Sequence, residues 1–304
     1  MDPLQQSNAA AMRVLVTGAA GRLGAAIVDV FQDAQVIAHV RSSLDITDAA
    51  AVSRAVGAAR PDVIINCAAF NDVDGAEGAP LAALAVNAFA PRNLARAARD
   101  AGATFVHYGT DFVFDGRTTQ PWDETAQPSP QSTYSASKLL GEWFAFDAPR
   151  AYVLRVESLF GAVSNWTGRT GTMDSIVAGL ESGREVRVFT DRIVSPSYVP
   201  DIAAATRHLI LTSAPPGVYH CVNAGQATWY ELAKAAAELL QVTPRLVPVT
   251  VNDVQLKAHR PQFCALSPEK LAAAGFPMPP WQDAMRRWLQ GRVNPTIYRM
   301  RING

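Results

Sequence analysis

Short apolar runs alternate with helical apolar periodicity through the first half of the chain. The runs predict buried strands, and the segments in which apolar residues recur every three or four positions predict helices. Apolar strands that alternate with helices are typical of a parallel sheet covered on both faces, and right-handed crossovers make such a sheet doubly wound. The expected strands are 13–17, 35–40, 62–66, 104–108 and 151–156, and the expected helices are 22–31, 48–59, 80–101 and 132–146.

The pattern loosens after residue 156, where glycine, proline and tryptophan become frequent and the elements shorten. The sequence therefore predicts an α/β fold, a doubly wound parallel sheet of the Rossmann-like kind, with a smaller, discontinuous C-terminal lobe. Residues 1–11 are expected to be a short disordered lead-in. The expected elements of the second half are helices at 172–182, 200–211, 228–240 and 281–290 and strands at 185–189 and 217–222.

Three glycines follow the first strand and open the first helix with the spacing G-x-x-G-x-x-G. Gly18 would allow a tight turn, Gly21 would let the backbone approach a pyrophosphate, and Gly24 would let the helix pack closely on the sheet. The helix N-terminus would offer free N–H groups to the phosphates, although glycine-rich turns without a ligand also occur. The loop predicts a dinucleotide cofactor beside Gly18, Ala20, Gly21, Arg22 and Leu23.

The end of the second strand carries no acid that could bind a ribose 2′-hydroxyl. Arg41 lies there, and it or Arg22 could meet a 2′-phosphate, unless both are solvated surface charges. This favours NADPH, with NADH as the alternative. Asp45 and Ile46 could border the adenine.

Small residues follow the third strand, at the sheet edge where open α/β sheets bind ligands. Cys67, Ala68 and Ala69 would let the backbone run close to the cofactor, and simple tight packing under a helix is an equal alternative.

A candidate catalytic group lies between the fourth strand and the following helix. Tyr134 and Lys138 are four residues apart, which puts both on one helix face. A cation lowers the pKa of a tyrosine, so Tyr134 could give a proton to a carbonyl oxygen. Thr110 could hydrogen-bond the same oxygen, and Lys138 could also bind the nicotinamide ribose. An isolated Tyr-x-x-x-Lys match is usually a surface pair, but the glycine loop and Thr110 reverse those odds. Asp111 could accept a substrate hydroxyl or cap a turn.

Residues 17–24, 66–69, 109–114 and 134–138 together resemble the extended short-chain dehydrogenase/reductase superfamily. Within it the chain is similar to the dTDP-4-dehydrorhamnose reductase family, above all in the stretch TDFVFDG at 110–116. The resemblance implies an NADPH- or NADH-dependent reductase of a nucleotide-linked 4-keto-6-deoxy sugar. It implies catalytic roles for Thr110, Tyr134 and Lys138 and places Asp111 and Phe112 against the sugar. We expect a dinucleotide-binding domain over 12–156, with 190–220 returning to it, and a substrate lobe over 157–189 and 221–304.

One stretch departs from the family pattern. The family usually has a tryptophan after the fifth strand that lines the sugar site, whereas residues 156–160 here read VESLF, with Ser158 in that place. This leaves the identity of the sugar open. Glu157 could bind a sugar hydroxyl or amine, or be a buried acid paired with Arg155 or Arg192. Arg192 could instead contact a pyrophosphate-linked substrate.

Two other functions stay open. A non-catalytic branch of the same family is the regulatory subunit of methionine adenosyltransferase, and the altered stretch at 156–160 keeps that possibility alive. A nucleotide-sugar epimerase on the same fold would hold NAD tightly and consume none. A homodimer is plausible by family resemblance.

Composition excludes several classes. Lys plus Arg and Asp plus Glu each number 27, which gives a net charge of zero and argues against a nucleic-acid partner. The three cysteines are far apart and the histidines lack metal-ligand spacing, so we expect no metal site. Cysteine usage fits a reducing cytoplasm, and no segment predicts a signal peptide or a membrane span.

Overall fold

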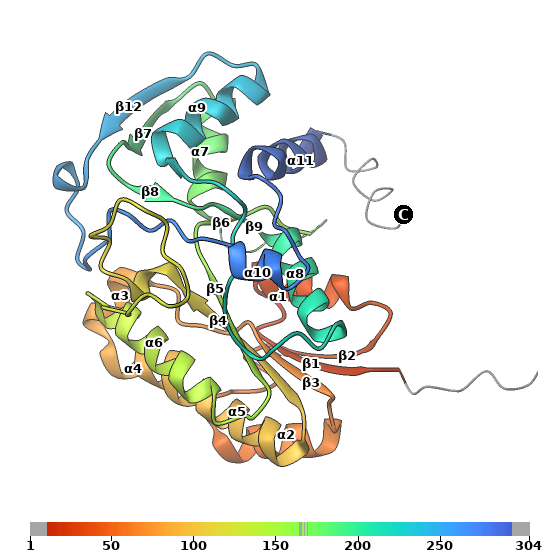
Figure 1. Cartoon of the computed structure of the whole chain (residues 1–304). Helices are drawn as coiled ribbons and strands as arrows, with labels where there is room; N and C mark the ends of the chain where they lie inside the picture. The colour runs from red at the N-terminus through yellow and green to blue at the C-terminus, as the bar shows by residue number, and fades with distance from the viewer. Residues whose placement is uncertain (1–10, 164–165, 167, 169, 294–304) are drawn as a thin grey trace, which may run out of the picture.

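The computed structural model describes residues 11–163, 166, 168 and 170–293 and shows one long sheet with helices on both faces (Figure 1). All six strands of this main sheet are parallel, in the order β10-β5-β4-β3-β1-β2, which confirms the expected doubly wound sheet. The order reverses between β1 and β3, and sheets of this kind bind ligands at such a point. The strands are β1 (Arg13–Thr17), β2 (Gln35–His39), β3 (Val63–Asn66), β4 (Thr104–Thr110), β5 (Ala151–Val156) and β10 (Gly217–His220).

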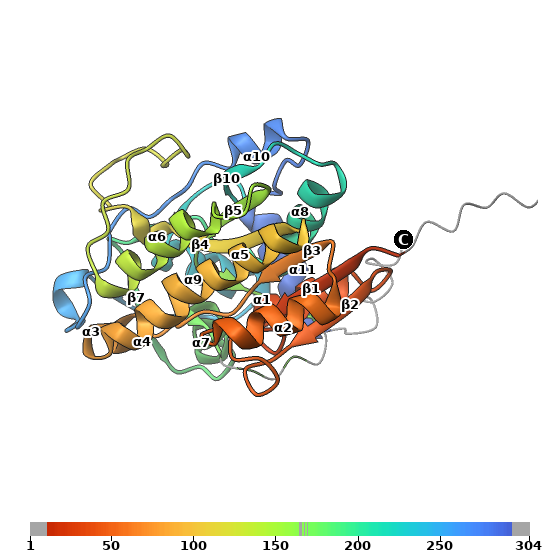
Figure 2. The same cartoon turned by 90° about the horizontal axis from the view of Figure 1, so that it is seen from below.

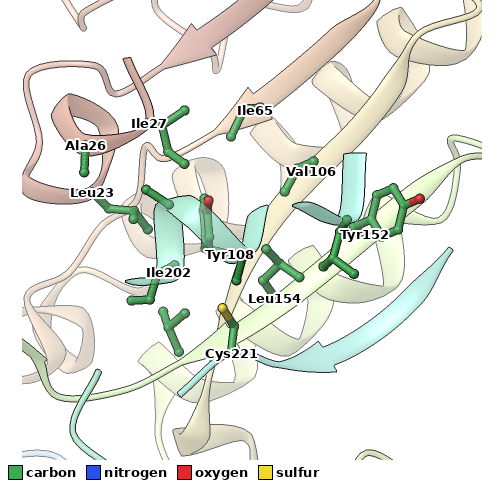
Figure 3. Close-up of a cluster of buried hydrophobic side chains, with 14 of the residues drawn as sticks. Leu23, Ala26, Ile27, Ile65, Val106, Tyr108, Tyr152, Leu154, Ile202 and Cys221 are labelled. Carbon is green, nitrogen blue, oxygen red and sulfur yellow. The ribbon is translucent and has the colours of Figure 1, made fainter. Parts of the chain in front are cut away.

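Helices cover the main sheet on both sides. Successive residues of β1 point to opposite faces: Val14 and Val16 pack beneath α1 and α8, and Leu15 packs beneath α2 and α5. Figure 3 shows the first of these two cores, in which Leu23 and Ile27 of α1 meet side chains of β3, β4 and β5. The helices are α1 (Arg22–Val30) and α8 (Val199–Leu211) on one face, and α2 (Ala49–Ala59), α5 (Ala90–Ala101) and α6 (Thr133–Ala145) on the other (Figure 2).

The helix expected at 80–101 is not regular. It consists of α4 (Pro80–Leu84), a π-helical turn η1 (Ala85–Phe89) and α5, so the expected long helix is present and contains a π-turn that the sequence did not predict. The turn accommodates Asn87, whose side chain is 1% exposed and bonds away from the helix. A π-turn of this kind is common at functional sites.

A second lobe follows β5 and lies in the upper part of Figure 1. Its helices α7 (Thr172–Glu181), α9 (Trp229–Leu240) and α11 (Trp281–Val293) share an apolar core with the parallel pair β7 (Glu185–Phe189) and β12 (Arg245–Val249). The short strands β6 (Leu159–Phe160) and β9 (Ser197–Tyr198) pair with each other, as do β8 (Ile193–Val194) and β11 (Ala227–Thr228). The remaining elements are α3 (Val73–Gly78), η2 (Asp111–Val113), η3 (Val251–Asp253) and α10 (Glu269–Ala273).

The other expected elements are present, with ends that differ by up to three residues. The sequence pattern missed α3, α10 and β12, the last because Pro248 lies inside it and proline is rare within strands. The expected lead-in at 1–11 falls, except for residue 11, outside the described residues, as does the end of the expected substrate lobe at 294–304. Within the described part of the chain, no helix has the length and apolar character needed to cross a membrane.

Candidate active site

The glycine loop packs against the backbone that follows β3. Gly18 has φ +69°, and a Cβ atom there would lie 2.5 Å from the Ala68 nitrogen. A Cβ on Gly24 would lie 2.2 Å from the Gly18 carbonyl oxygen. Both positions therefore require glycine, which leaves a narrow backbone cradle. The first turn of α1 has no capping side chain and no acid, so its N–H groups are available to an anion. These features fit a dinucleotide pyrophosphate.

The end of β2 lies beside this loop, because Ala19 N donates to the His39 carbonyl oxygen at 3.1 Å. Arg41 follows and is exposed. Asp45 is also exposed, and hydrogen bonds from Thr47 lower its pKa. Ile46 is buried under α2. The exposed guanidinium of Arg41 is thus within the segment that adjoins the cradle.

Arg22 points away from this segment, toward the second lobe. Its guanidinium forms an ion pair with Asp174, donates to the Gly161 carbonyl oxygen at 3.1 Å and lies over the Trp166 ring. These contacts connect the first helix to α7. The structure therefore favours Arg41 over Arg22 as the arginine that could meet a 2′-phosphate.

Asn66 connects three neighbouring strands, β1, β3 and β4. Its Oδ1 accepts from Thr17 Oγ1 at 2.7 Å and from Ala68 N at 3.1 Å, and its Nδ2 bonds to His107 Nδ1 at 3.1 Å. Cys67 N donates to the Thr17 carbonyl oxygen at 3.0 Å. This network holds Cys67, Ala68 and Ala69 against the glycine loop.

Tyr134 lies in the first turn of α6. That helix begins with a capping box in which Ser132 Oγ accepts from Ser135 N at 3.2 Å and Ser135 Oγ accepts from Ser132 N at 2.9 Å. The phenol is 8% exposed, its ring meets Phe112 edge-on at 6.1 Å between centroids, and it lies beside the Thr110 hydroxyl. The structure thus brings Thr110 and Tyr134 together.

The electrostatics of Tyr134 differ from the expectation. Burial raises its pKa above the usual value and the Asp111 carboxylate raises it further, while Thr110 and Arg260 oppose part of the rise. The expected lowering by Lys138 is wrong for this structure, because Lys138 Nζ donates to the Tyr108 carbonyl oxygen at 2.5 Å. Burial lowers the pKa of Lys138 itself to about 8. Tyr134 is therefore held in its protonated form.

A buried ion pair lies one helical turn beyond Lys138. Arg155 of β5 and Glu142 of α6 are joined by a contact of 2.8 Å between Nη2 and Oε2. The expectation that Arg155 pairs with Glu157 is wrong, because the α6 carboxylate takes the guanidinium. The Glu142 charge also acts on Lys138 and favours its ammonium form.

Asp111 and Phe112 form the short turn η2 directly after β4. Asp111 Oδ1 accepts from Thr110 Oγ1 at 2.8 Å, and burial raises the pKa of Asp111 to about 6. The guanidinium groups of Arg192 and Arg260 each lie 5.9 Å from the Phe112 ring centroid. Two cations and an aromatic ring therefore adjoin Tyr134, which suits an anionic substrate.

Glu157 and Ser158 follow β5. Ser158 has φ +47°, an uncommon conformation for serine, and the chain bends there. Glu157 is 3% exposed, and its Oε1 accepts from Ser195 N at 2.7 Å. No arginine pairs with it among the described residues, so the expected partner Arg192 is also wrong at the level of a direct ion pair.

Several residues near the site were not predicted. Asn87 holds both the N–H and the carbonyl of Phe70, and its Nδ2 donates to Ser137 Oγ at 3.0 Å. The available signal was an asparagine among the small apolar residues of an alanine-rich helix. Ser195, Arg260 and Cys264 come from loops that follow β5 in the chain, for which local sequence gave no signal.

This geometry places the protein in the class of short-chain dehydrogenase/reductases, and the lobe after β5 places it among the extended members of that class. The chain belongs to the RmlD substrate binding domain family, which it matches over residues 12–293. The resemblance expected from the sequence is thereby confirmed.

Relatives of known name cover nearly the whole chain. The dTDP-4-dehydrorhamnose reductase of Streptomyces griseus is 36% identical over 284 residues, which is 90% of this chain and 91% of the relative. The spore coat polysaccharide biosynthesis protein SpsK of Bacillus subtilis is 33% identical over 283 residues, 92% and 98% of the two chains. The crystal structure of dTDP-4-dehydrorhamnose reductase from Bacillus anthracis in complex with NADP has a TM-score of 0.86 and 31% identity, with 92% of this chain and 99% of that chain covered.

Proposed function

We propose that this protein is an NADPH-dependent reductase of a nucleotide-linked 4-keto-6-deoxy sugar. The observation that carries the proposal is the position of Tyr134, packed beside Thr110 at the same end of the sheet as the glycine loop. Family membership and the named relatives support the same activity. The complex of the Bacillus anthracis relative with NADP supports the cofactor.

Each of the site's functional groups has one task in the proposed reaction. The dinucleotide, when bound, supplies the hydride. Tyr134 donates its phenolic proton to the carbonyl oxygen of the sugar, and the Thr110 hydroxyl would turn from Asp111 to donate a hydrogen bond to that oxygen. Burial and Asp111 keep Tyr134 protonated, which suits a donor in the direction of reduction. Lys138 would bind the nicotinamide ribose from its place above Tyr108.

The remaining assignments follow the same division of the chain. Gly18, Ala20, Gly21 and Leu23 would hold the pyrophosphate, Arg41 the 2′-phosphate, and Asp45, Ile46 and 67–69 the rest of the dinucleotide. Asp111, Phe112, Glu157, Ser158 and Arg192 would contact the nucleotide sugar. Residues 12–156 with 190–220 would form the cofactor domain, supported by the pairing of β10 with β5, and 157–189 with 221–304 the substrate lobe. The free cysteines support a cytoplasmic location.

An apolar surface supports a homodimer. Several of the exposed large apolar side chains among the described residues lie on neighbouring segments (Figure 2): Leu81 and Phe89 on α4–η1, Trp143 on α6 and Phe146 directly after α6. A second copy would bury this surface. Sedimentation equilibrium should give a dimer for the wild type and a monomer for Trp143→Glu, with Leu211→Glu on α8 as the control. A monomeric wild type contradicts the assignment.

Oxidation of NADPH with a panel of dTDP-4-keto-6-deoxy sugars tests the activity. Tyr134→Phe should lower turnover by at least ~100-fold, the usual scale for a lost proton donor. Tyr230→Phe on α9 is the matched control and should behave as the wild type. Sugar conversion without net cofactor use would indicate an epimerase. No turnover, with tight binding of a partner enzyme, would indicate the regulatory role.

A further inference from the structure

The side chains of two acids and a cysteine lie close together next to Thr110. Asp111 follows β4, Glu157 follows β5, and Cys264 lies in the loop before α10. One polar atom from each lies within 4.8 Å of the other two. All three side chains are buried, with 4%, 3% and 1% exposed. The two carboxyl groups are therefore near neighbours, and both residues are almost fully buried.

The hydrogen bonds of this cluster are incomplete. Asp111 accepts from Thr110, and Glu157 Oε1 accepts from Ser195 N at 2.7 Å. Glu157 Oε2 is buried and has no hydrogen-bond partner in the structure. A buried charged oxygen without a partner costs several kcal/mol, whereas a protonated oxygen needs only an acceptor. One carboxylate oxygen of Asp111 lies within 4.8 Å of one carboxylate oxygen of Glu157, so Asp111 is the neighbouring group that could accept that proton.

The surrounding charges offset one negative charge and not two. Arg192 is the cation that acts on Asp111, Glu157 and Cys264 alike. On the far side of Thr110 lie Tyr134 and Arg260, and Arg260 is already paired with Asp74 at 3.1 Å. The Cys264 thiol stays protonated, because burial raises its pKa.

We propose that Asp111 and Glu157 hold one proton between them, carried on Glu157 Oε2, and that this pair recognises a neutral hydroxyl of the sugar. Asp111 accepts the hydroxyl proton and Glu157 donates to the hydroxyl oxygen, so Glu157 is a specificity-determining residue. The substrate class is a hydroxylated sugar without an ammonium group at that position. The sugar part of this inference rests on the proposed reductase function.

Electrostatics agree with the assignment of the proton. Burial and the neighbouring Asp111 charge raise the pKa of Glu157 well above its usual range, and burial raises that of Asp111 to about 6. Like charges held this close in a buried site do not both ionise near neutral pH. Near neutral pH the site therefore carries one carboxylic acid and one carboxylate, balanced by Arg192.

The first test needs no substrate. At pH 7 the infrared spectrum of the wild type should contain the carbonyl stretch of one protonated carboxylic acid. Glu157→Gln should remove this band. Glu238→Gln, exposed on α9, is the control and should leave the band in place. Asp111→Asn should keep the band at pH 7 and shift its loss to a different pH.

Three spectral results would overturn the proposal. The band could be absent from the wild type, or it could persist in Glu157→Gln. It could also appear only after treatment with a chelator, in which case the three groups would be holding a divalent cation. The infrared test can be carried out even if the reductase assay fails. Failure of the proposed reductase function and failure of the shared-proton proposal can therefore be distinguished.

Kinetics give the second test. In Glu157→Gln the amide oxygen can accept from Ser195 and the amide N–H₂ can donate in place of the acid. Its kcat/KM at pH 7 should stay within about threefold of the wild type, whereas Glu157→Ala should lose about tenfold or more, mainly in KM. The wild type should lose kcat/KM at high pH as Glu157 ionises, and Glu157→Gln should not show that loss. Equal damage by Gln and Ala at pH 7 would show that the carboxylate is the working form.

Discussion

Arg155 on β5 and Glu142 on α6 form an ion pair in which the arginine side chain is 5% exposed and the glutamate side chain 2%. Three hydrogen bonds join them, from Nε to both carboxylate oxygens and from Nη2 to Oε2. The pair ties the helix that carries Tyr134 to the centre of the main sheet. The ion pair thereby fixes the position of α6 relative to β4.

Loss of one partner should be costly. Glu142→Ala leaves a buried guanidinium without its anion, which destabilises a fold by about 3 kcal/mol or more. Asp100→Ala removes a partner from the exposed pair Arg99–Asp100 and should cost less than about 1 kcal/mol. Urea unfolding of the two variants measures the contrast. Equal losses of unfolding free energy in the two variants would mean that the buried ion pair stabilises the fold no more than the exposed pair does.

Gly18 should tolerate no side chain. Gly18→Ala adds strain at φ +69° and a clash with the Ala68 backbone. Gly102→Ala is the matched control, because Gly102 also has φ +69° but its added Cβ meets nothing within 4 Å. The control should lose about 1 kcal/mol of stability and keep NADPH binding. Gly18→Ala should lose more stability and most of its NADPH fluorescence response. Normal binding by Gly18→Ala would exclude this loop as the phosphate cradle.

Lys138 should make stability depend on pH. Its pKa is about 8 in the folded protein against an ordinary 10.5, so the unfolded chain binds more protons between these values. The free energy of unfolding contributed by this group therefore rises with pH across the window from 8 to 10.5, by about 3 kcal/mol in all. Relative to Lys138→Met, the wild type should gain that amount in urea unfolding. Lys234→Met, exposed on α9, is the control for the loss of a surface ammonium group. A constant difference for Lys138→Met would contradict the buried ammonium.

Arg41 should distinguish the two cofactors. A guanidinium that meets a 2′-phosphate contributes about 1.5–3 kcal/mol, so Arg41→Ala should weaken NADPH binding by roughly 10- to 100-fold and leave NADH nearly unchanged. Arg54→Ala, exposed on α2, is the control for general charge loss. Fluorescence titration with both dinucleotides measures the effect. Equal weakening of both would remove Arg41 from the 2′-phosphate site.

Much of the sheet and of the cofactor loop could be predicted, because both depend on patterns within short stretches of sequence. The apolar runs of β1 and β3 are local, and so is the spacing of Gly18, Gly21 and Gly24. Tyr134 and Thr110 meet because parallel strands and the following helices bring their ends to one edge. The topology alone implied that meeting.

The surroundings of Glu157 could not be predicted in this way. Its orientation depends on the φ of Ser158 and on Ser195, which comes from a segment distant in the sequence. The closeness of Arg155 in sequence suggested an ion pair, but Glu142 reaches that guanidinium from the helix across the sheet face. Contacts between distant segments decide such partners, and neither periodicity nor spacing encodes them.

Because of the π-turn at Ala85–Phe89, the number of residues in this helix decides whether Asn87 reaches Phe70. A chain one residue shorter at this point would form an uninterrupted α-helix, and the carboxamide of Asn87 would rotate out of reach of Phe70. Natural or engineered deletions should therefore be tolerated at the outer end of α5 long before they are tolerated here.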